Sequence, residues 1–155
     1  MVKPNAPVAL CLLEDVTPAL LDLRHRLLRK GQPPESASYP DVDPLPTTKH
    51  LGAFAEERLV GCATMQADPS STGNPTCRLR IRGMAVDPAW QGQGIGTRMV
   101  QQLQQWARKE NSGIWCNARI LAVPMYARCG FEITSEEFDM PLIGPHYNME
   151  WNDAS

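Results

Sequence analysis

The ten residues QGQGIGTRMV, from Gln91 to Val100, place three glycines at alternate positions where a helix begins. Each glycine inside a helix costs about 1 kcal/mol relative to alanine, so three of them need a physical reason. The first turn of a helix leaves about four backbone N–H groups without partners, and the helix dipole adds partial positive charge there. Without side chains in the way, a phosphate can reach those amides. The stretch therefore predicts a main-chain anion cradle between a strand and a helix.

The residues on either side of the glycines fit that arrangement. In CRLRIRGMAV, residues 77–86, apolar and basic residues alternate, which predicts a strand. The alternation slips at Gly83, which predicts a β-bulge, and Asp87-Pro88 predicts a turn. After the glycines, a helix is predicted to about residue 110, because apolar residues recur on one face. These are Ile95, Met99, Leu103, Trp106 and Ala107.

Elsewhere, hydrophobic periodicity predicts the remaining elements. Thr17 and Pro18 indicate the start of a helix that Gly31 ends. The segment 32–48 carries five prolines and three acidic residues, and loops of that length are often binding loops. Predicted strands cover residues 8–13 (a buried one), 50–54, 59–65, 77–86, 113–118, 131–134 and 146–151, and a short helix covers 121–128.

Length and composition limit the class of protein. A chain of 155 residues with 43% apolar and 21% charged residues predicts one globular domain over residues 1–155. The net charge of −2 argues against non-specific nucleic-acid binding, which needs a basic surface. No apolar run approaches the roughly 18 residues of a membrane span, and the N-terminus lacks the pattern of a signal peptide.

The cysteines indicate the compartment. Five are scattered along the chain without a CxxC pair, which predicts reduced core thiols in a cytoplasmic protein. A cysteine nucleophile remains an open alternative. They are Cys11, Cys62, Cys77, Cys116 and Cys129.

Two nucleotide-binding motifs fail on the residues of the glycine stretch. A dinucleotide fingerprint needs G-x-G-x-x-G, but here the third glycine is Gly96 and position 97 is Thr. A P-loop needs a Gly-Lys pair, and the chain has none. The pattern present is Q-x-x-G-x-G, from Gln91 to Gly96.

That pattern resembles the acetyl-CoA motif of the GNAT superfamily of N-acetyltransferases. NARILAVPMYARCGFE, residues 117–132, resembles the second motif of the family, in which a tyrosine precedes a Gly-Phe pair by four residues. The resemblance is strong from about Leu79 to Glu132 and weaker in the first third. It implies an α/β (α+β) fold: a mixed, mostly antiparallel central sheet of about six to seven strands, flanked by helices, with a splayed parallel strand pair.

The resemblance also implies a set of cofactor contacts. The main chain of Met84, Ala85 and Val86 is expected to bind the pantetheine arm of acetyl-CoA. Asn117 stands at the end of the partner strand, where family members often contact the cofactor. Tyr126 is expected to contact acetyl-CoA and to protonate the leaving CoA thiolate. The pyrophosphate is expected on the backbone amides of Gln91, Gly92, Gln93, Gly94, Ile95, Gly96 and Thr97. No metal is implied.

The general base is less well defined. Many family members use a glutamate on the long strand, but this strand carries Arg78, Arg80 and Arg82. These arginines are either a solvated strand face or a site for an acidic acceptor. His146 is the preferred base because a histidine titrates near neutral pH. His50, Asp41, Asp43 and Glu35 remain alternatives.

The sequence thus predicts an N-acetyltransferase that moves an acetyl group from acetyl-CoA to a primary amine by direct attack in a ternary complex. The alternative is a non-catalytic acyl-CoA-binding or sensor module of the same fold. Such a module binds the cofactor through the same cradle, and Tyr126→Phe has no consequence in it. Separate structural alternatives are that Tyr126 packs on Phe131, that Asn117 satisfies the backbone at the strand end and that His146 is structural. An acyl group longer than acetyl, and a homodimer, stay open. The acidic loop favours a cationic acceptor and the arginine row an acidic one.

Overall fold

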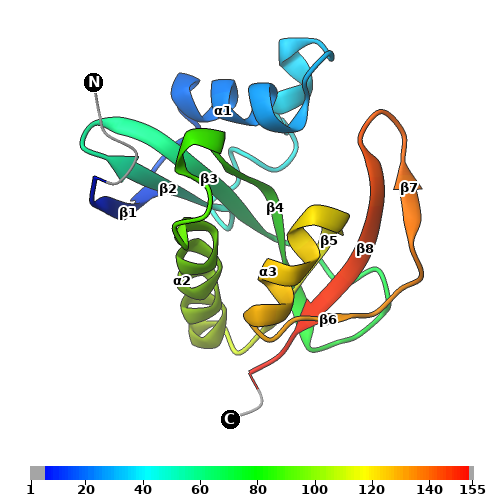
Figure 1. The fold of residues 1–155 in the computed structure, drawn as a ribbon. Coiled ribbons are helices and arrows are strands. Elements are labelled where there is room, and N and C mark those ends of the chain that lie inside the picture. The colour runs from blue at the N-terminus through cyan, green and yellow to red at the C-terminus, as the bar shows by residue number, and fades with distance from the viewer. Residues whose placement is uncertain (1–5, 154–155) are drawn as a thin grey trace. The chain divides into compact units, whose positions relative to one another are not determined.

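The computed structural model describes residues 6–153, with the elements labelled in Figure 1. The hydrogen-bonded strand order is β1-β2-β3-β4-β5-β8-β6, and β7 pairs with β8. The β4–β5 pair is parallel, while β1–β2 and all pairs of β8 are antiparallel. This confirms the predicted mixed sheet and adds an eighth strand. None of the helices in residues 6–153 has the length and apolarity to cross a membrane.

The elements follow the predicted ranges closely. The helices are α1 (Pro18–Leu28), α2 (Ile95–Lys109) and α3 (Val123–Arg128), and 3₁₀ turns cover Pro34–Ala37, Pro88–Trp90 and Ile120–Ala122. The strands are β1 (Val8–Leu13), β2 (Lys49–Ala55), β3 (Arg58–Ala67), β4 (Cys77–Val86), β5 (Gly113–Arg119), β6 (Glu132–Ile133), β7 (Phe138–Met140) and β8 (Gly144–Trp151).

The chain divides into two compact units, each made of segments distant in sequence. Of the described residues, the first unit holds 6–64 and 83–99, and the second holds 65–82 and 100–153. The strands β3 and β4 and the helix α2 therefore each contribute to both units. The single domain expected over residues 1–155 stays a prediction.

In the first unit, α1 packs its apolar face on β3 and β4. The hydroxyl of Thr17 accepts a hydrogen bond from the Leu20 N–H at 3.2 Å, so the predicted N-cap is confirmed. Leu20 and Leu23 are buried in one cluster with Leu59 and Cys62 of β3 and Ala85 of β4.

The first strand differs from its prediction. β1 was expected to be buried, but its residues are exposed or half-buried, and Leu12 is 53% exposed. The strand order places β1 at the end of the sheet, where it pairs with β2. An edge strand keeps one side open to solvent, which a short apolar run does not reveal.

In the second unit, β5 lies between β4 and β8. In its parallel pairing with β4, Gly113 lies opposite Cys77 at one end and Cys116 lies opposite Ile81 at the other. The pairing shifts register between Cys77 and Leu79, earlier in the strand than the predicted bulge. Gly83, where the bulge was expected, has a φ of +63° inside β4, a left-handed geometry that favours glycine.

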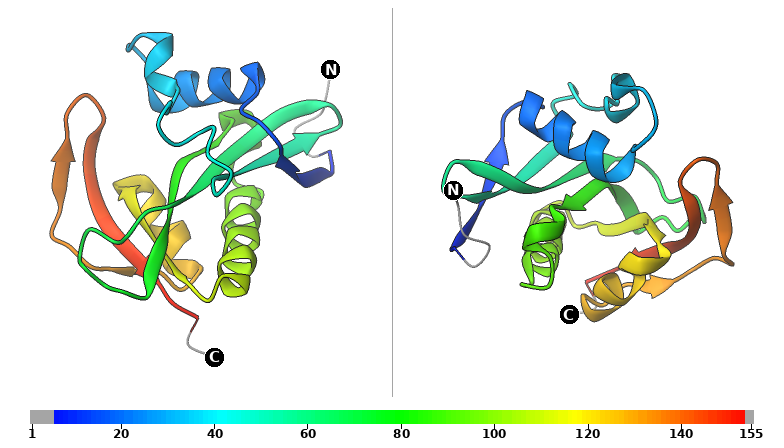
Figure 2. Two further views of the ribbon diagram at one scale, coloured as in Figure 1. Left: turned by 180° about the vertical axis from the view of Figure 1, so that it is seen from behind. Right: turned by 45° about the horizontal axis from the view of Figure 1, so that its top comes forward.

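The unpredicted strand belongs to a hairpin at the end of the second unit. β7 runs beside the curved β8 (Figure 2), and Phe138 pairs with His146. The residues TSEEFDM, 134–140, have no apolar alternation, so no strand was predicted there. β6 covers two residues, fewer than the predicted 131–134.

Candidate functional site

The glycine stretch of the first unit forms an exposed turn of open main chain. Gly92 and Gly94 have φ angles of +80° and +79°, and a Cβ on either would meet no atom within 4 Å. Residues 91–94 are exposed. The left-handed angles explain why glycine is needed at both positions. The empty space in front of them fits an approaching anion.

The turn is held in place by its own neighbours. The side chain of Gln91 donates from Nε2 to the carbonyl oxygen of Val86 at 2.9 Å, which ties the turn back to β4. Asp87 accepts from the Ala89 N–H at 3.0 Å and forms an ion pair with Arg58 at 3.3 Å. The Gln91 side chain is therefore structural, and its main chain remains the expected cofactor contact.

The helix that follows directs its first amides toward the turn. The Arg98 N–H donates to the Gly94 carbonyl at 3.0 Å, so the amides of residues 95–97 precede this intrahelical bond and belong to the unpaired first turn. Ile95 is 3% exposed and anchors the helix, and the first turn holds no acidic side chain. The positive end of the helix dipole is thus not neutralised locally.

Tyr126 lies in the second unit on α3. It is 4% exposed, hydrogen-bonds the thiol of Cys116 and meets the Phe131 ring edge-on at 5.2 Å between centroids. Burial and the neighbouring Cys116 raise the pKa of Tyr126 well above its ordinary value. The hydroxyl therefore keeps its proton, as a general acid must, and the expected packing on Phe131 is also present.

Asn117 and His146 lie on facing strands of the second unit. Asn117 stands opposite Asn148, whose Nδ2 is 3.4 Å from the Asn117 Oδ1. His146 is 4% exposed, and its Nδ1 lies 2.8 Å from the Gly144 carbonyl oxygen. A carbonyl only accepts, so Nδ1 carries the hydrogen and Nε2 holds the lone pair of the neutral ring.

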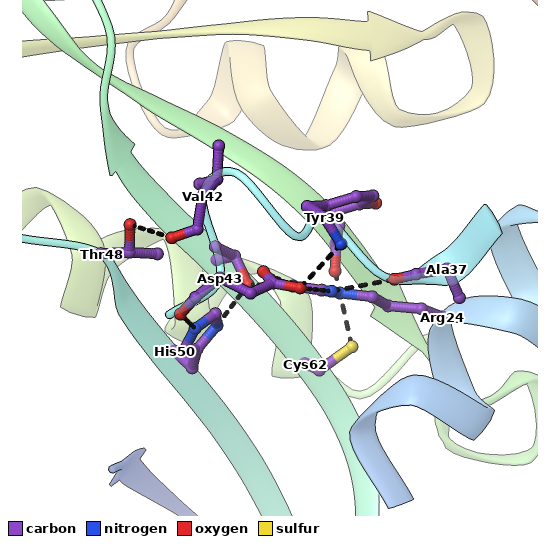
Figure 3. Close-up of polar contacts among 10 residues, drawn as sticks. Arg24, Ala37, Tyr39, Val42, Asp43, Thr48, His50 and Cys62 are labelled. Atoms are coloured by element: carbon purple, nitrogen blue, oxygen red, sulfur yellow. Dashed lines mark hydrogen bonds and ion pairs between the residues drawn. The ribbon is translucent and has the colours of Figure 1, made fainter. Parts of the chain in front are cut away.

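A buried polar cluster in the first unit surrounds Arg24 (Figure 3). Its guanidinium is fully buried and makes a bidentate ion pair with Asp43 at 2.8 and 3.0 Å. It also donates to Thr64 Oγ1 at 2.7 Å and to the Ala37 carbonyl at 3.0 Å. The ring of Tyr39 covers it at 4.1 Å. One side chain thus fixes the proline-rich loop on α1 and β3.

The same cluster engages two of the alternative bases. Burial tends to raise the pKa of Asp43, but hydrogen bonds from Arg24 and the Tyr39 N–H outweigh it and hold the pKa below its usual value. His50 has Nε2 3.0 Å from the Asp43 carbonyl and Nδ1 2.8 Å from the Thr64 hydroxyl. Both residues have structural partners, and Glu35 and Asp41 are exposed on the loop.

Sequence reasoning did not single out Arg24, although a signal was present. Arg24 stands four residues after Leu20 and three before Leu27, and so lies on the apolar face of α1. A basic residue at such a position needs a buried partner.

The three arginines of β4 are not a bare solvated row. Arg78 donates to the main-chain carbonyls of Glu110 and Asn111 at 3.2 and 3.1 Å, at the end of α2. Arg80 pairs with Asp68 at 3.4 Å and stacks over the Trp115 ring at 4.6 Å. These contacts give the first two arginines structural roles in the second unit.

The buried cysteines are expected to be poor nucleophiles. Burial raises the pKa of Cys62 and of Cys116 to about 12, so both stay thiols at neutral pH and are poor nucleophiles. Cys77 is buried and Cys129 half-buried, but Cys11 is exposed, so the prediction of core thiols is wrong for Cys11.

Glu150 of β8 anchors the loop between β3 and β4. Its carboxylate accepts hydrogen bonds from Ser70, from Thr72 and, at 3.1 Å, from Asn74. Burial tends to raise its pKa, but these three bonds outweigh burial and lower the pKa. A lowered folded-state pKa means stability that is present above the unfolded value of about 4.3 and is lost as the pH falls through the folded value.

Glu150→Gln is therefore expected to cost about 1–3 kcal/mol of unfolding free energy at pH 7, because hydrogen bonds to a charged acceptor are lost. The cost should shrink as the pH falls below about 4. Urea unfolding at pH 7, 5, 4 and 3 measures both. Glu132→Gln, an exposed neighbour in register, is the control. A cost that does not change with pH contradicts the assignment.

Two sequence comparisons find related proteins. The model of the acetyltransferase (GNAT) family matches residues 17–131. The uncharacterized N-acetyltransferase YitI of Bacillus subtilis (strain 168) is 30% identical over 129 residues, which cover 83% of this chain and 86% of the relative.

Solved structures show the same fold. An acyl-CoA N-acyltransferase from Pseudomonas aeruginosa is 21% identical over 93% of this chain and 99% of its own, with a TM-score of 0.71. An aminoglycoside 6'-N-acetyltransferase complexed with coenzyme A is 14% identical over 92% and 96%, with a TM-score of 0.74.

Proposed function

We propose that this chain, which belongs to the acetyltransferase (GNAT) family, transfers an acetyl group from acetyl-CoA to a primary amine. The observation that carries the proposal is the turn at residues 91–97. It combines exposed left-handed glycines, open space in front of them and the positive end of a helix. A pyrophosphate is the group that such main chain binds.

The proposed cofactor contacts are the ones that the sequence leads us to expect. The main chain of Met84, Ala85 and Val86 holds the pantetheine arm and residues 91–97 hold the pyrophosphate. Asn117 and Tyr126 also contact the cofactor. The solved relative in complex with coenzyme A, which shares the fold, supports the choice of ligand.

The proposed reaction is direct attack of the amine on the thioester in a ternary complex. Two substrates held together supply much of the acceleration. His146 accepts the proton of the amine through Nε2, since Nδ1 is bound to the Gly144 carbonyl. Tyr126 donates its proton to the departing CoA thiolate, and its raised pKa keeps that proton in place. The raised pKa values of Cys62 and Cys116 make both thiols poor nucleophiles, which supports direct attack without an acetyl-cysteine intermediate.

Titration calorimetry with acetyl-CoA, NAD and ATP tests the cradle. We expect micromolar binding of acetyl-CoA alone. Gly94→Ala should weaken it about tenfold, because a side chain at positive φ costs about 1–2 kcal/mol and shifts the turn.

Gly31→Ala is the matched control, since Gly31 has a φ of +83° and equally open space outside the turn. It should lose similar stability but bind acetyl-CoA as the wild type does. No binding by the wild type would refute the proposed function. If Gly94→Ala binds acetyl-CoA as tightly as the wild type does, the pyrophosphate does not bind at this turn.

A further inference from the structure

The partner of Asn117 in the second unit is itself firmly held. Asn148 is 3% exposed and stands opposite Asn117 in the β5–β8 register. Its Nδ2 donates to Ser71 Oγ at 3.0 Å and to Asn117 Oδ1 at 3.4 Å. Both hydrogens of this amide nitrogen are thus directed to protein acceptors.

The remaining polar atoms of Asn148 are hydrogen-bonded as well. Its Oδ1 accepts from the Thr134 hydroxyl. Its main-chain N–H donates to Ser135 Oγ, and its carbonyl accepts from the Thr134 N–H, both at 2.9 Å. In this orientation the carboxamide pairs Nδ2 with the Ser71 hydroxyl and Oδ1 with the Thr134 hydroxyl, so both of its polar atoms have partners.

The consequence falls on Asn117. Because its Oδ1 faces a donor, its own Nδ2 points away from Asn148 and presents hydrogen-bond donors. We propose that Asn148 is a positioning residue, which fixes the Asn117 carboxamide so that it binds a carbonyl oxygen of the cofactor. The two amide carbonyls of the pantetheine arm have that chemistry. The inference rests on the proposed function, in which Asn117 contacts acetyl-CoA.

Asn148→Asp separates this role from a structural one. The carboxylate has the same size, still accepts from Thr134, and can accept from Ser71 once that hydroxyl rotates. Because the new carboxylate can only accept, the Asn117 carboxamide must rotate by about 180° to donate to it. That rotation presents the Asn117 oxygen to the cofactor carbonyl. Glu150 on the same strand shows that a carboxylate 8% exposed can be held by neutral donors.

For Asn148→Asp we expect calorimetry to give a roughly tenfold larger dissociation constant for CoA. The reason is that a hydrogen bond between Asn117 and the cofactor is replaced by two facing acceptors. Ser71→Ala is the matched control: it removes the other acceptor of the same Nδ2 and should bind CoA within about twofold of the wild type. Thermal unfolding of each variant shows that it is folded.

Asn117→Asp is a second variant that leaves Asn148 intact. The carboxylate still accepts from Asn148 and presents oxygen in place of N–H, so the loss should equal that of Asn148→Asp. Wild-type affinity in either aspartate variant would overturn the inference, as would an equal loss in Ser71→Ala. No CoA binding by the wild type would overturn the proposed function as well, and that result is distinct from the others.

Discussion

Replacing Arg24 by alanine is expected to lower the free energy of unfolding by about 3–5 kcal/mol, because the change leaves the Asp43 carboxylate buried without its cation. The Asp43 side chain is 8% exposed and that of Arg24 is fully buried. The pKa of Asp43 is held below its usual value chiefly by its hydrogen bond from Arg24, against the effect of burial. Without the guanidinium, the carboxylate loses the strongest of the contacts that offset burial and keeps the hydrogen bond from the Tyr39 N–H.

Arg26→Ala on the same helix is the matched control. Arg26 pairs with Asp22 at 2.8 Å, but the two side chains are 46% and 62% exposed. Such a surface pair contributes about 0.3–0.5 kcal/mol. Urea unfolding at pH 7 measures both variants. Equal losses of unfolding free energy in the two variants would show that the buried ion pair stabilises the fold no more than the surface pair does.

A double variant, Arg24→Met with Asp43→Leu, tests the cause. Removing both charges removes the uncompensated carboxylate, so the double change should cost less than Arg24→Ala alone. A cost larger than that of the single variant would place the effect in lost packing around Tyr39 rather than in the ion pair. The three measurements thus separate charge from shape.

The Arg24 cluster also marks the limit of what the sequence predicted. Helix α1 was predicted from Thr17, Pro18 and the leucine spacing, because caps and periodicity are local signals. The contact between Arg24 and Asp43 joins residues 19 apart, and no local pattern specifies which loop residue reaches a helix. The proline-rich segment was expected to be irregular, and it is so outside the 3₁₀ turn Pro34–Ala37, but its anchor was not identified.

The candidate site divides in the same way. Gly92 and Gly94 were predicted from their spacing, and their positive φ angles follow from the turn they make. The partner of Asn117 was not predicted, since Asn148 lies 31 residues away and the pairing depends on strand register. Strand β7 was missed because its residues lack alternation. The main-chain features could therefore be predicted from the sequence, whereas the side-chain partners could not, because they depend on tertiary structure.

Tyr126→Phe is expected to reduce kcat by about a hundredfold or more, because general acid catalysis contributes roughly 10²–10⁴-fold. The dissociation constant for acetyl-CoA should not change in proportion. The substitution keeps the ring that packs on Phe131 and removes only the hydroxyl. Release of free thiol from acetyl-CoA measures turnover, with aminoglycosides, polyamines, amino acids and peptides as amine acceptors.

Two further variants separate catalysis from structure. Tyr147→Phe, a half-buried tyrosine of β8, should leave turnover unchanged. Cys116→Ala removes the hydrogen-bond partner of Tyr126 and should reduce turnover far less than Tyr126→Phe. Equal losses in the two would make the bond to Cys116, rather than proton donation, the role of the hydroxyl.

The pH dependence gives an independent check on the acid. A general acid must be protonated, and the pKa of Tyr126 is raised well above its ordinary value of about 10. Its deprotonation should therefore cause no fall in kcat up to about pH 10. A turnover that decreases between pH 8 and 10 in the wild type, but not in Tyr126→Phe, would contradict the buried, protonated state. Unchanged turnover in Tyr126→Phe at every pH would remove Tyr126 from the reaction and favour a different proton donor to the CoA thiolate.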